Sequence, residues 1–332
     1  MTLAFVYQIV ILLGCFILSW FLTRKIRSVA LDRQVMDIPN ERSCHTRPTP
    51  RGGGLAFVGT FVAACLLDMA LLREFSSPEI PRVLAVVIPL ALLGLVDDVK
   101  NLPARTRLVV HLLIAAAALF LFPDALYIFG EAPVSIAFSS LLVVVGVAAM
   151  INFYNFMDGT DALVAGCFFL QGLFFALHLG QSAWLLASAA ALGFLYWNQP
   201  PAKIFMGDIG STVLGGAVAC AIVAGLERNM AFPASVAVTL PLTADAAYTI
   251  FRRLLKRENI FAAHRQHIYQ RLHVSAGWTH GRVALAYMLL TALFGAMILT
   301  LGTAGAWASL IISAALIISA EIHLNSKKNS RT

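Results

Sequence analysis

Residues 134–153 read VSIAFSSLLVVVGVAAMINF, a run of 20 residues without a charged side chain. A membrane-spanning helix needs about 20 mainly apolar residues to cross roughly 30 Å of hydrocarbon. This stretch therefore predicts a helix that spans a bilayer. Ten other stretches satisfy the same rule, near residues 3–22, 53–72, 81–96, 107–122, 162–179, 182–198, 211–226, 232–250, 282–301 and 304–320.

The composition of the whole chain agrees with this interpretation. Of 332 residues, 59% are hydrophobic and 12% are charged, and the mean hydropathy is +0.81. A soluble domain carries about 25% charged residues, so this chain could not cover a water-exposed surface of its size. We therefore expect a single all-α integral membrane domain over residues 1–332, a polytopic bundle of about 11 transmembrane helices. The five cysteines lack C-x-x-C spacing, which favours packing roles over disulfides or a thiolate metal site.

The distribution of Lys and Arg predicts the orientation of the chain. With an external N-terminus, the segments on the inner side, including the C-terminal residues 321–332, hold 21 of the 24 basic residues, and only Arg73, Arg82 and Arg228 lie outside. The positive-inside rule therefore predicts a periplasmic N-terminus and a cytoplasmic C-terminus. Nearly all the acids, amides and histidines that are candidates for a functional site fall in the inner segments. We therefore expect the active face of the protein in the cytoplasm.

Two adjacent aspartates, Asp97 and Asp98, end the third predicted span. Two carboxylates side by side at a membrane boundary repel each other and are costly unless a cation compensates them. Hard divalent cations take oxygen ligands, so a metal ion is the economical explanation. The alternative is a pair of solvated acids that cap the next turn, with Lys100 and Arg105 nearby.

Polar residues also follow the fifth predicted span and precede the eighth. Asn155, Asp158 and Asp161 are spaced three apart, so on a helix they would share a face, although Asp161 would also suit the N-cap of the sixth span. Asp208 is flanked by glycines just before the eighth span. A helix N-terminus there would suit a phosphate, and a plain N-cap is the alternative.

Two further inner segments are rich in residues that could contact phosphates. Residues 36–54 contain three prolines and the run Gly52–Gly54, which break a helix and let backbone approach a ligand closely. Residues 252–271 carry five arginines together with His264 and His267. Asp245, in the ninth predicted span, lies two helical turns before Arg252, which favours an internal ion pair.

Five motifs, in this order, resemble those of the polyprenyl-phosphate N-acetylhexosamine-1-phosphate transferases, the superfamily of WecA and MraY, and most closely its WbpL-like O-antigen initiators. The resemblance extends from residue 37 to residue 272 and so covers most of the chain. The motifs are DIPNERxxH (Asp37–His45), GLVDDV (Gly94–Val99), NFMDGTD (Asn155–Asp161), FMGDIGS (Phe205–Ser211) and AHRQHIYQRL (Ala263–Leu272).

This resemblance implies a reaction in which undecaprenyl phosphate attacks the β-phosphorus of a UDP-N-acetylhexosamine and UMP leaves, with Mg²⁺, or alternatively Mn²⁺, as the cofactor. It makes Asp208 a metal ligand, Asp98 a metal-linked acid close behind it, and Asp97 the base that keeps the lipid phosphate ionised. The catalytic loops are expected at about 23–52, 97–107, 154–161, 199–210 and 251–281. Substrate-binding roles fall on His45, Asn155, Asp158, Asp161, Asn198, Lys203, His264, Arg265, His267 and Arg271.

One departure from the family pattern concerns the sugar. WecA-like members carry HIHH where this chain reads His267-Ile268-Tyr269-Gln270, so roles of the later two histidines do not transfer. A 6-deoxy sugar such as FucNAc or QuiNAc is therefore expected beside GlcNAc as the donor sugar. The implied location is the bacterial inner membrane, among membrane lipids, without a nucleic-acid partner, and a homodimer is left open. A transporter or flippase of a lipid-linked or anionic solute is the alternative from another class.

Overall fold

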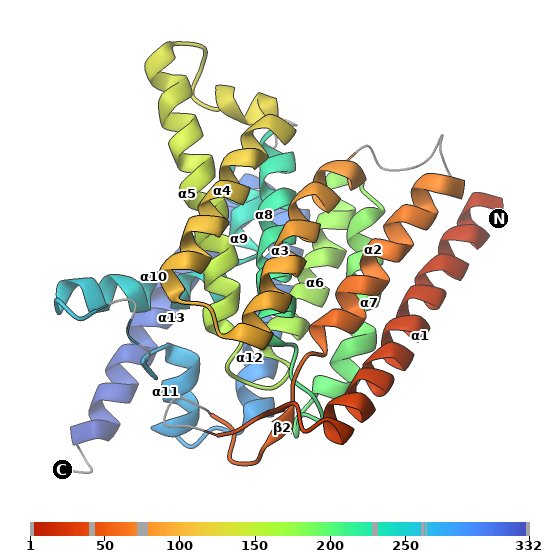
Figure 1. Cartoon of the computed structure of the whole chain (residues 1–332). Helices are drawn as coiled ribbons and strands as arrows, with labels where there is room; N and C mark the ends of the chain where they lie inside the picture. The colour runs from red at the N-terminus through yellow and green to blue at the C-terminus, as the bar shows by residue number, and fades with distance from the viewer. Residues whose placement is uncertain are drawn as a thin grey trace.

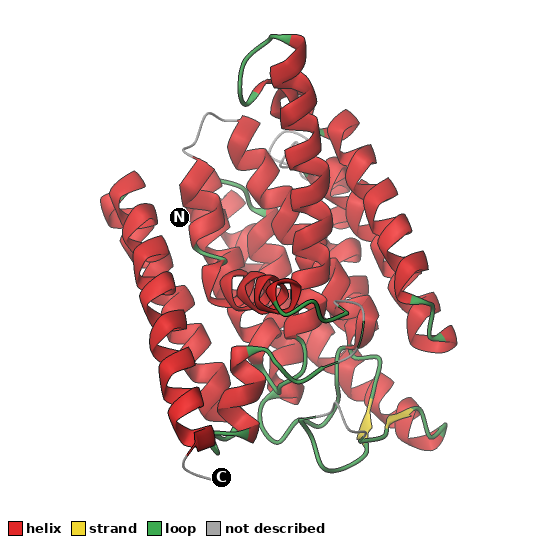
Figure 2. Ribbon diagram, turned by 90° about the vertical axis from the view of Figure 1, so that its left-hand side faces the viewer, coloured by secondary structure: helices red, strands yellow, loops and turns green. Residues whose placement is uncertain are grey.

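The computed structural model describes residues 3–39, 44–71, 79–227, 232–259, 262 and 264–329. Residues 40–43 and Ala263, which belong to two of the motifs above, lie outside the described residues, as do Arg73 and Arg228. The described chain is a bundle of long helices with a small two-stranded hairpin at one end (Figures 1 and 2). The helices are α1 (Leu3–Asp32), α2 (Gly54–Leu71), α3 (Ile80–Lys100), α4 (Ala104–Leu121), α5 (Pro133–Met157), α6 (Leu163–Leu179), α7 (Ala183–Asn198), α8 (Gly207–Glu227), α9 (Phe232–Ala237), α10 (Leu240–Leu255), α11 (Ile268–Val274), α12 (His280–Leu301) and α13 (Thr303–Asn329).

The prediction of an all-α integral membrane protein is confirmed. Within the described residues, seven helices (α1, α3, α4, α5, α8, α12 and α13) are long and apolar enough to cross a membrane. The shorter apolar helices α2, α6 and α7 coincide with three more of the predicted spans. Ten of the eleven expected spans thus correspond to one helix each.

The ninth predicted span, 232–250, is wrong as a single helix. It is divided into α9 and α10, and the chain turns at Val238–Thr239 between them. Pro241 occupies the first turn of α10, where its missing N–H costs nothing but where it could not continue a preceding helix. Figure 1 shows α10 extending sideways out of the bundle, and Figure 2 shows the same helix nearly end-on. The chain therefore returns from the far end of α8 in two helices rather than one.

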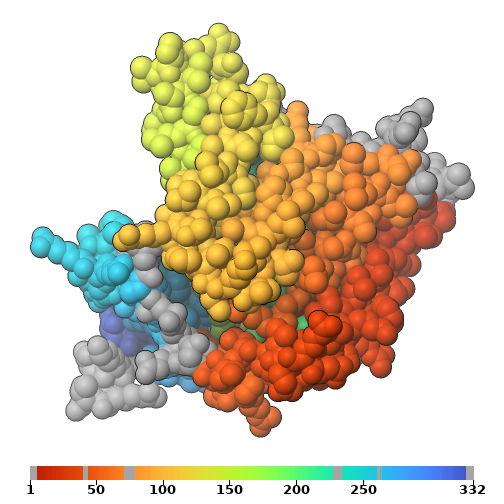
Figure 3. All heavy atoms as spheres, in the orientation of Figure 1, coloured from red at the N-terminus to blue at the C-terminus, as the bar shows by residue number. Residues whose placement is uncertain are grey.

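The core of the bundle is α8, the most buried of the long helices. It contacts α2, α3 and α5 along its length. In the space-filling view, side chains of α1 to α4 cover most of this face of the molecule and little of α8 is visible (Figure 3). Residues of α8 therefore lie close to those of three other helices.

Glycines let two helices approach the first turn of α8. A Cβ atom added at Gly94 of α3 would lie 2.4 Å from the Cα of Ile209, and one added at Gly54 of α2 would lie 2.5 Å from the backbone N of Gly210. No larger residue fits at either position without a shift of backbone. These contacts set the distance between the end of α3 and the start of α8.

The segment before α2 reaches the same place through backbone pairing. Strands β1 (Met36–Asp37) and β2 (Thr49–Pro50) form an antiparallel pair. Beyond β2, the N–H of Phe205 donates to Pro50, the N–H of Gly53 donates to Phe205, and that of Gly54 to Met206. Residue 51 is thereby fixed beside the start of α8.

Candidate active site

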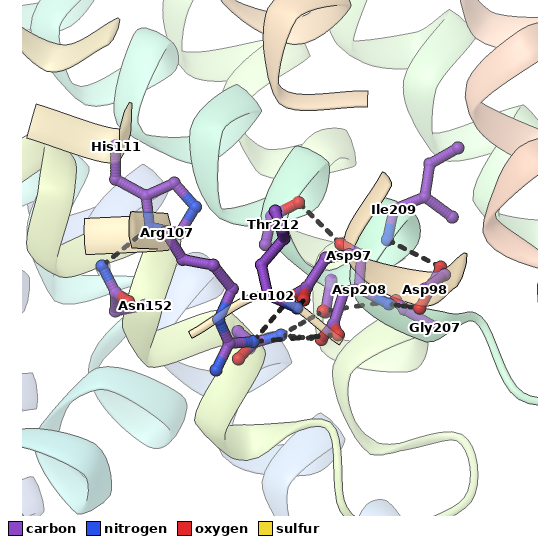
Figure 4. Close-up of polar contacts among 12 residues, drawn as sticks. Asp97, Asp98, Leu102, Arg107, His111, Asn152, Gly207, Asp208, Ile209 and Thr212 are labelled. Atoms are coloured by element: carbon purple, nitrogen blue, oxygen red, sulfur yellow. Dashed lines mark hydrogen bonds and ion pairs between the residues drawn. The ribbon is translucent and has the colours of Figure 1, made fainter. Parts of the chain in front are cut away.

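Three aspartates gather at the N-terminus of α8, from two helices far apart in sequence (Figure 4). Asp97 and Asp98 lie in the last turn of α3, and Asp208 lies in the first turn of α8. The Asp98 carboxylate accepts the N–H of Asp208 at 2.8 Å and that of Ile209 at 3.2 Å. Asp98 thus caps α8, because a carboxylate satisfies N–H groups that the first helical turn leaves unpaired.

Gly207 makes this cap geometrically feasible. Its φ is +74°, a conformation that residues with a Cβ rarely adopt. An added Cβ would also lie 2.6 Å from the Asp98 carboxylate. The positive φ and the contact with Asp98 therefore explain why a glycine precedes Asp208 in the FMGDIGS motif.

Two arginines that the sequence analysis did not single out flank Asp208. Arg51 donates to the Asp98 carboxylate and to Asp208 Oδ2 at 3.0 Å. Arg107 donates to Asp97 Oδ2 at 2.8 Å and lies 3.8 Å from Asp208 Oδ2. Burial alone would lower the pKa of Arg51, but Asp98 and Asp208 outweigh it, so the pKa is raised and the guanidinium stays charged.

Asn155 completes the surroundings of Asp208. Its side-chain amide donates to Asp208 Oδ1 at 2.6 Å and to the Ser211 hydroxyl at 3.0 Å. Both Asp208 oxygens are therefore held, one by an amide and one by Arg51. Nearby, burial and the charge of Asp208 raise the pKa of Asp158 well above its ordinary value. A carboxyl that retains its proton at higher pH can donate a hydrogen bond to a substrate oxygen.

Asp161 holds the chain together rather than capping α6, whose N-cap position is Ala162 and has no side-chain cap. Asp161 Oδ2 accepts the N–H of Ala202 at 3.0 Å, and Oδ1 lies 3.1 Å from His280 Nδ1. Asn198 makes a parallel link, accepting from the N–H of Ala162 and donating to the carbonyl of Ile204. These contacts join the loop after α5, the segment before α8 and the start of α12.

A cavity of about 260 Å³ opens beside these groups. Six of the predicted site residues line it, namely His45, Asn155, Asp158, Asp161, Asn198 and Asp208. Among its other lining residues are Arg51 and His280. The site is therefore built from five separated segments of the chain, all at the end of the bundle that carries the hairpin; we call this end the site end.

Lys203 does not line this cavity. Its ammonium group lies over the rings of Tyr196 and Trp197, 5.6 and 5.3 Å from their centroids. Its role in the structure is a cation–π contact that holds the segment before α8 against α7.

The predicted residues of the basic loop do not line the cavity either. His267 is buried, with Nδ1 3.7 Å from Asp245 Oδ1, and its ring lies 5.0 Å from that of His264. Arg265 and Arg271 line a second cavity on the other side of α11. Of α11, it is Tyr269 that faces the aspartate site, because its hydroxyl donates to the carbonyl of Phe156 at 3.0 Å.

The predicted ion pair between Asp245 and Arg252 is wrong. The Asp245 carboxylate accepts the N–H groups of Ile268 and Tyr269, at 2.8 and 3.0 Å, and the Tyr287 hydroxyl at 2.7 Å. Arg252 instead donates to Glu321. Helical spacing placed the two residues in reach along one helix, but the N-terminus of α11 provides Asp245 with better donors.

The residues around Asp208 fit a divalent cation that is shared with a substrate. Asp98 and Asp208 are bridged by the positive guanidinium of Arg51, so the space between these two carboxylates accommodates a cation. Among the described residues, no cluster of three or more His, Cys, Asp or Glu side chains could enclose a metal by itself. Mg²⁺ is commonly held by one or two carboxylates together with substrate phosphates and water, so two carboxylates are sufficient.

Arg51, Arg107 and His280 are the site residues that sequence reasoning missed. Each lies at or just before the start of an apolar span, where Arg51 and Arg107 also satisfy the positive-inside rule. The only signal for Arg51 was its position directly before the Gly52–Gly54 run. His280 had no signal, since its partner Asp161 lies 119 positions earlier in the chain.

Comparison with known proteins adds to this geometry. The profile of glycosyl transferase family 4 matches residues 80–226. The chain is 30% identical to the probable undecaprenyl-phosphate N-acetylglucosaminyl 1-phosphate transferase of Bacillus subtilis, over 91% of this chain and 87% of the relative. It is 32% identical to the decaprenyl-phosphate N-acetylglucosaminephosphotransferase of Mycobacterium tuberculosis H37Rv, over 82% and 77% of the two chains. It is also 32% identical to the phospho-N-acetylmuramoyl-pentapeptide-transferase of a Geobacillus species, over 74% and 81%.

Proposed function

Because this chain belongs to the polyprenyl-phosphate N-acetylhexosamine-1-phosphate transferase family, we propose that it transfers a HexNAc-1-phosphate from a UDP-sugar to undecaprenyl phosphate. The products would be the undecaprenyl-diphosphate-linked sugar and UMP. One observation carries this proposal: Asp208, with Asp98, Arg51 and Asn155 around it, lies at the mouth of a membrane-spanning bundle. At this position, positively and negatively charged groups are accessible both to a lipid headgroup and to a water-soluble substrate.

The position of the site suits two substrates of opposite solubility. The acceptor has its hydrocarbon chain in the bilayer, so its phosphate must react at the interface. The donor is a water-soluble nucleotide sugar made in the cytoplasm. The excess of Lys and Arg in the segments at the site end supports a cytoplasmic orientation of that end in the bacterial inner membrane. In this arrangement the chain crosses eleven times, and the ninth crossing is made by the chain between α8 and α11, which includes the short helix α9 and the sideways helix α10.

In the proposed reaction, an oxygen of the lipid phosphate forms a bond to the β-phosphorus of the donor. The bond from that phosphorus to the oxygen shared with the α-phosphorus breaks, and UMP leaves with the electron pair. Several negative charges must approach one another, so the protein's work is mainly positioning and electrostatic compensation. Arg51 and Arg107 are placed to offset the charge of the phosphates, while Asn155 orients Asp208.

Mg²⁺, or alternatively Mn²⁺, is the proposed cofactor, with Asp208 and Asp98 as the residues that would hold it. Bound there, it would neutralise charge on the diphosphate and on the leaving UMP. Its site overlaps the present position of the Arg51 guanidinium between these two carboxylates. Arg51 would therefore be released toward the substrate phosphates.

Asp97 is proposed as the base that keeps the acceptor phosphate ionised. Its carboxylate is anchored by Arg107 and by the N–H of Leu102 at 2.7 Å. The same ion pair supports a second contribution, in which Asp97 holds Arg107 close to Asp208. The pH dependence of activity distinguishes the two contributions, because only a base sets the acidic limb of the profile.

The donor sugar is proposed to be a HexNAc of the FucNAc, QuiNAc or GlcNAc type, used to initiate O-antigen or a related surface polysaccharide. Tyr269 replaces a histidine of WecA-like members and packs behind the cavity wall. A Cβ on Gly159, which lines the cavity, would lie 2.2 Å from the Tyr269 hydroxyl. Only the backbone of Gly159 therefore lies between the Tyr269 side chain and the donor cavity. This closeness supports an altered sugar preference.

The decisive experiment is release of UMP by the purified full chain in detergent, with undecaprenyl phosphate and a panel of UDP-N-acetylhexosamines. We expect turnover that requires acceptor and divalent metal, and one preferred sugar in the panel. Asp32→Asn, at an exposed aspartate on α1 at the site end, is the matched control for aspartate variants of the site. Acceptor-independent counterflow of a solute in liposomes, without UMP release, would favour a transporter instead.

A further inference from the structure

A second charged cavity, of about 510 Å³, lies at the site end between α10, α11 and α13. It shares no lining residue with the cavity beside Asp208. Its charged lining consists of the cations Arg252, Lys256, Arg265 and Arg271 and the carboxylates Glu258 and Glu321. Two positive charges are thus in excess, which favours an anionic ligand.

The cations of this cavity are held in place before any ligand arrives. Glu321 accepts from Arg252 at 3.1 Å and also from Arg271, so one carboxylate brings two guanidinium groups together. Arg252 donates in addition to the Gln266 side chain at 3.1 Å. The Nε of Arg252 is buried and has no hydrogen-bond partner among the described residues. A buried donor without a partner is unfavourable unless a ligand or water accepts from it.

An apolar cavity of about 420 Å³ adjoins the charged one. It lies between α10, α11, α12 and α13, and its lining includes Leu272 of α11 and Ala320 of α13. These residues directly follow Arg271 and directly precede Glu321, which line the charged cavity. The two cavities are therefore lined by consecutive residues of α11 and of α13, so that a phosphate and a hydrocarbon chain could be bound side by side.

The helix beside this pair of cavities has the character of a segment at the level of lipid headgroups. Figure 1 shows α10 projecting sideways from the bundle, close to α11 and α13 and on the side away from α1. Phe251, Leu254 and Leu255 of α10 are exposed, and Lys256 follows them directly. A helix with exposed apolar side chains and a basic end is typical of the boundary between headgroups and acyl chains.

We propose that these adjoining cavities bind an anionic phospholipid of the bilayer. Its phosphate lies among Arg252, Lys256 and Arg271, and an acyl chain occupies the apolar cavity. This lipid is distinct from the acceptor, because no residue lines both this cavity and the one beside Asp208. Tyr269 of α11 faces the loop that lines the aspartate cavity, whereas Arg271 faces α13. A phosphate bound by Arg271 is therefore not presented to Asp208.

The test is native mass spectrometry of the purified full chain in detergent, with phosphatidylglycerol, phosphatidylethanolamine or undecaprenyl phosphate added separately. A basic residue near a lipid surface contributes about a fivefold change in affinity for an anionic headgroup. We expect preferential retention of phosphatidylglycerol over phosphatidylethanolamine, and about a fivefold loss of that retention in Lys256→Gln. Arg24→Gln, at an exposed arginine of α1 at the same end, should retain as much as the wild type.

A second variant, which is expected to increase lipid retention, keeps the test independent of folding. Asn325 is exposed at the rim of the charged cavity, so Asn325→Lys should raise phosphatidylglycerol retention about fivefold. Equal retention of the two phospholipids, or no response to Lys256→Gln and Asn325→Lys, would overturn the proposal. Stronger retention of undecaprenyl phosphate with the same dependence on Lys256 would also overturn it, because the cavity would then serve the acceptor. The measurement needs no donor and no turnover, so its failure is separable from failure of the transferase assay.

Discussion

The aspartate site and the cavity between α10, α11 and α13 are built from the same kind of ion pair but with opposite charge balance. At α8, Asp97, Asp98 and Asp208 surround two guanidinium groups, and acids are in excess. At α13, Glu321 alone receives both Arg252 and Arg271, and cations are in excess. The first region therefore calls for a cation and the second for an anion. The sign of the excess charge, rather than the presence of ion pairs, indicates the class of ligand.

Removing divalent metal should have the largest effect. If the excess of carboxylates at α8 is compensated by Mg²⁺ during turnover, chelation should abolish UMP release, and added Mg²⁺ or Mn²⁺ should restore it. Retention of phosphatidylglycerol should be unchanged by the same treatment. Undiminished turnover after chelation would remove the metal from the proposed mechanism.

Asp208→Asn should lower kcat about 10³-fold, because it removes the charge on which Arg51, Arg107 and Asn155 converge. UMP release at saturating substrates is the measurement, and Asp32→Asn is the control. A variant that retains turnover close to the wild type would exclude Asp208 as a metal ligand.

Asp97→Asn should lower kcat about 10²-fold through loss of a general base. Arg107→Gln removes its ion-pair partner and leaves the carboxylate in place. Comparison of their pH profiles sharpens the assignment: a base predicts loss of the acidic limb only in Asp97→Asn. If both variants keep that limb, Asp97 serves to position Arg107.

Gly94→Ala should destabilise the protein by about 1–3 kcal/mol, because the added methyl group would collide with the backbone of α8 at Ile209. Activity should fall with it, since Asp98 could no longer cap α8. Thermal unfolding in detergent measures the effect. Gly59→Ala on α2 is the control, because an added Cβ there meets nothing within 4 Å. Equal stability of the two variants would contradict close packing of α3 on α8.

Tyr269→Phe should have the smallest effect, about 1 kcal/mol, because it removes one hydrogen bond to the carbonyl of Phe156. We expect a small fall in the unfolding temperature and a shift in relative kcat/KM across the UDP-sugar panel. A uniform change over all sugars would show that Tyr269 stabilises the loop without influencing selection.

Patterns along the chain predicted the local features well. Ten predicted spans coincide with helices, because a long apolar run in a bilayer must satisfy its backbone within the segment. The acidic clusters at Asp97–Asp98, Asp158–Asp161 and Asp208 also meet at one end of the bundle as expected. The prediction of a single helix failed at 232–250, because hydropathy alone does not indicate the break before Pro241.

Partnerships between distant residues could not be predicted in the same way. Arg51 and Asp98 are 47 positions apart, and Asp161 and Asn198 are each joined to segments on other helices. The basic loop illustrates the converse: its histidines and arginines look alike in sequence, yet α11 directs Tyr269 to one cavity and Arg271 to another. Such choices depend on helix rotation, which a one-dimensional pattern does not contain.

By itself, the sequence determined that this protein lies in a membrane, where ten of its helices lie along the chain and which acids follow or precede the apolar spans. Those properties follow from apolar length and charge count, which are local. Only the tertiary structure decided that Asp98 caps α8, that Arg51 bridges Asp98 and Asp208, and that Arg271 belongs to a separate cavity. The physical reason is that hydrogen bonds and ion pairs act over about 3–4 Å in space, and close packing at Gly54 and Gly94 brings those atoms into range.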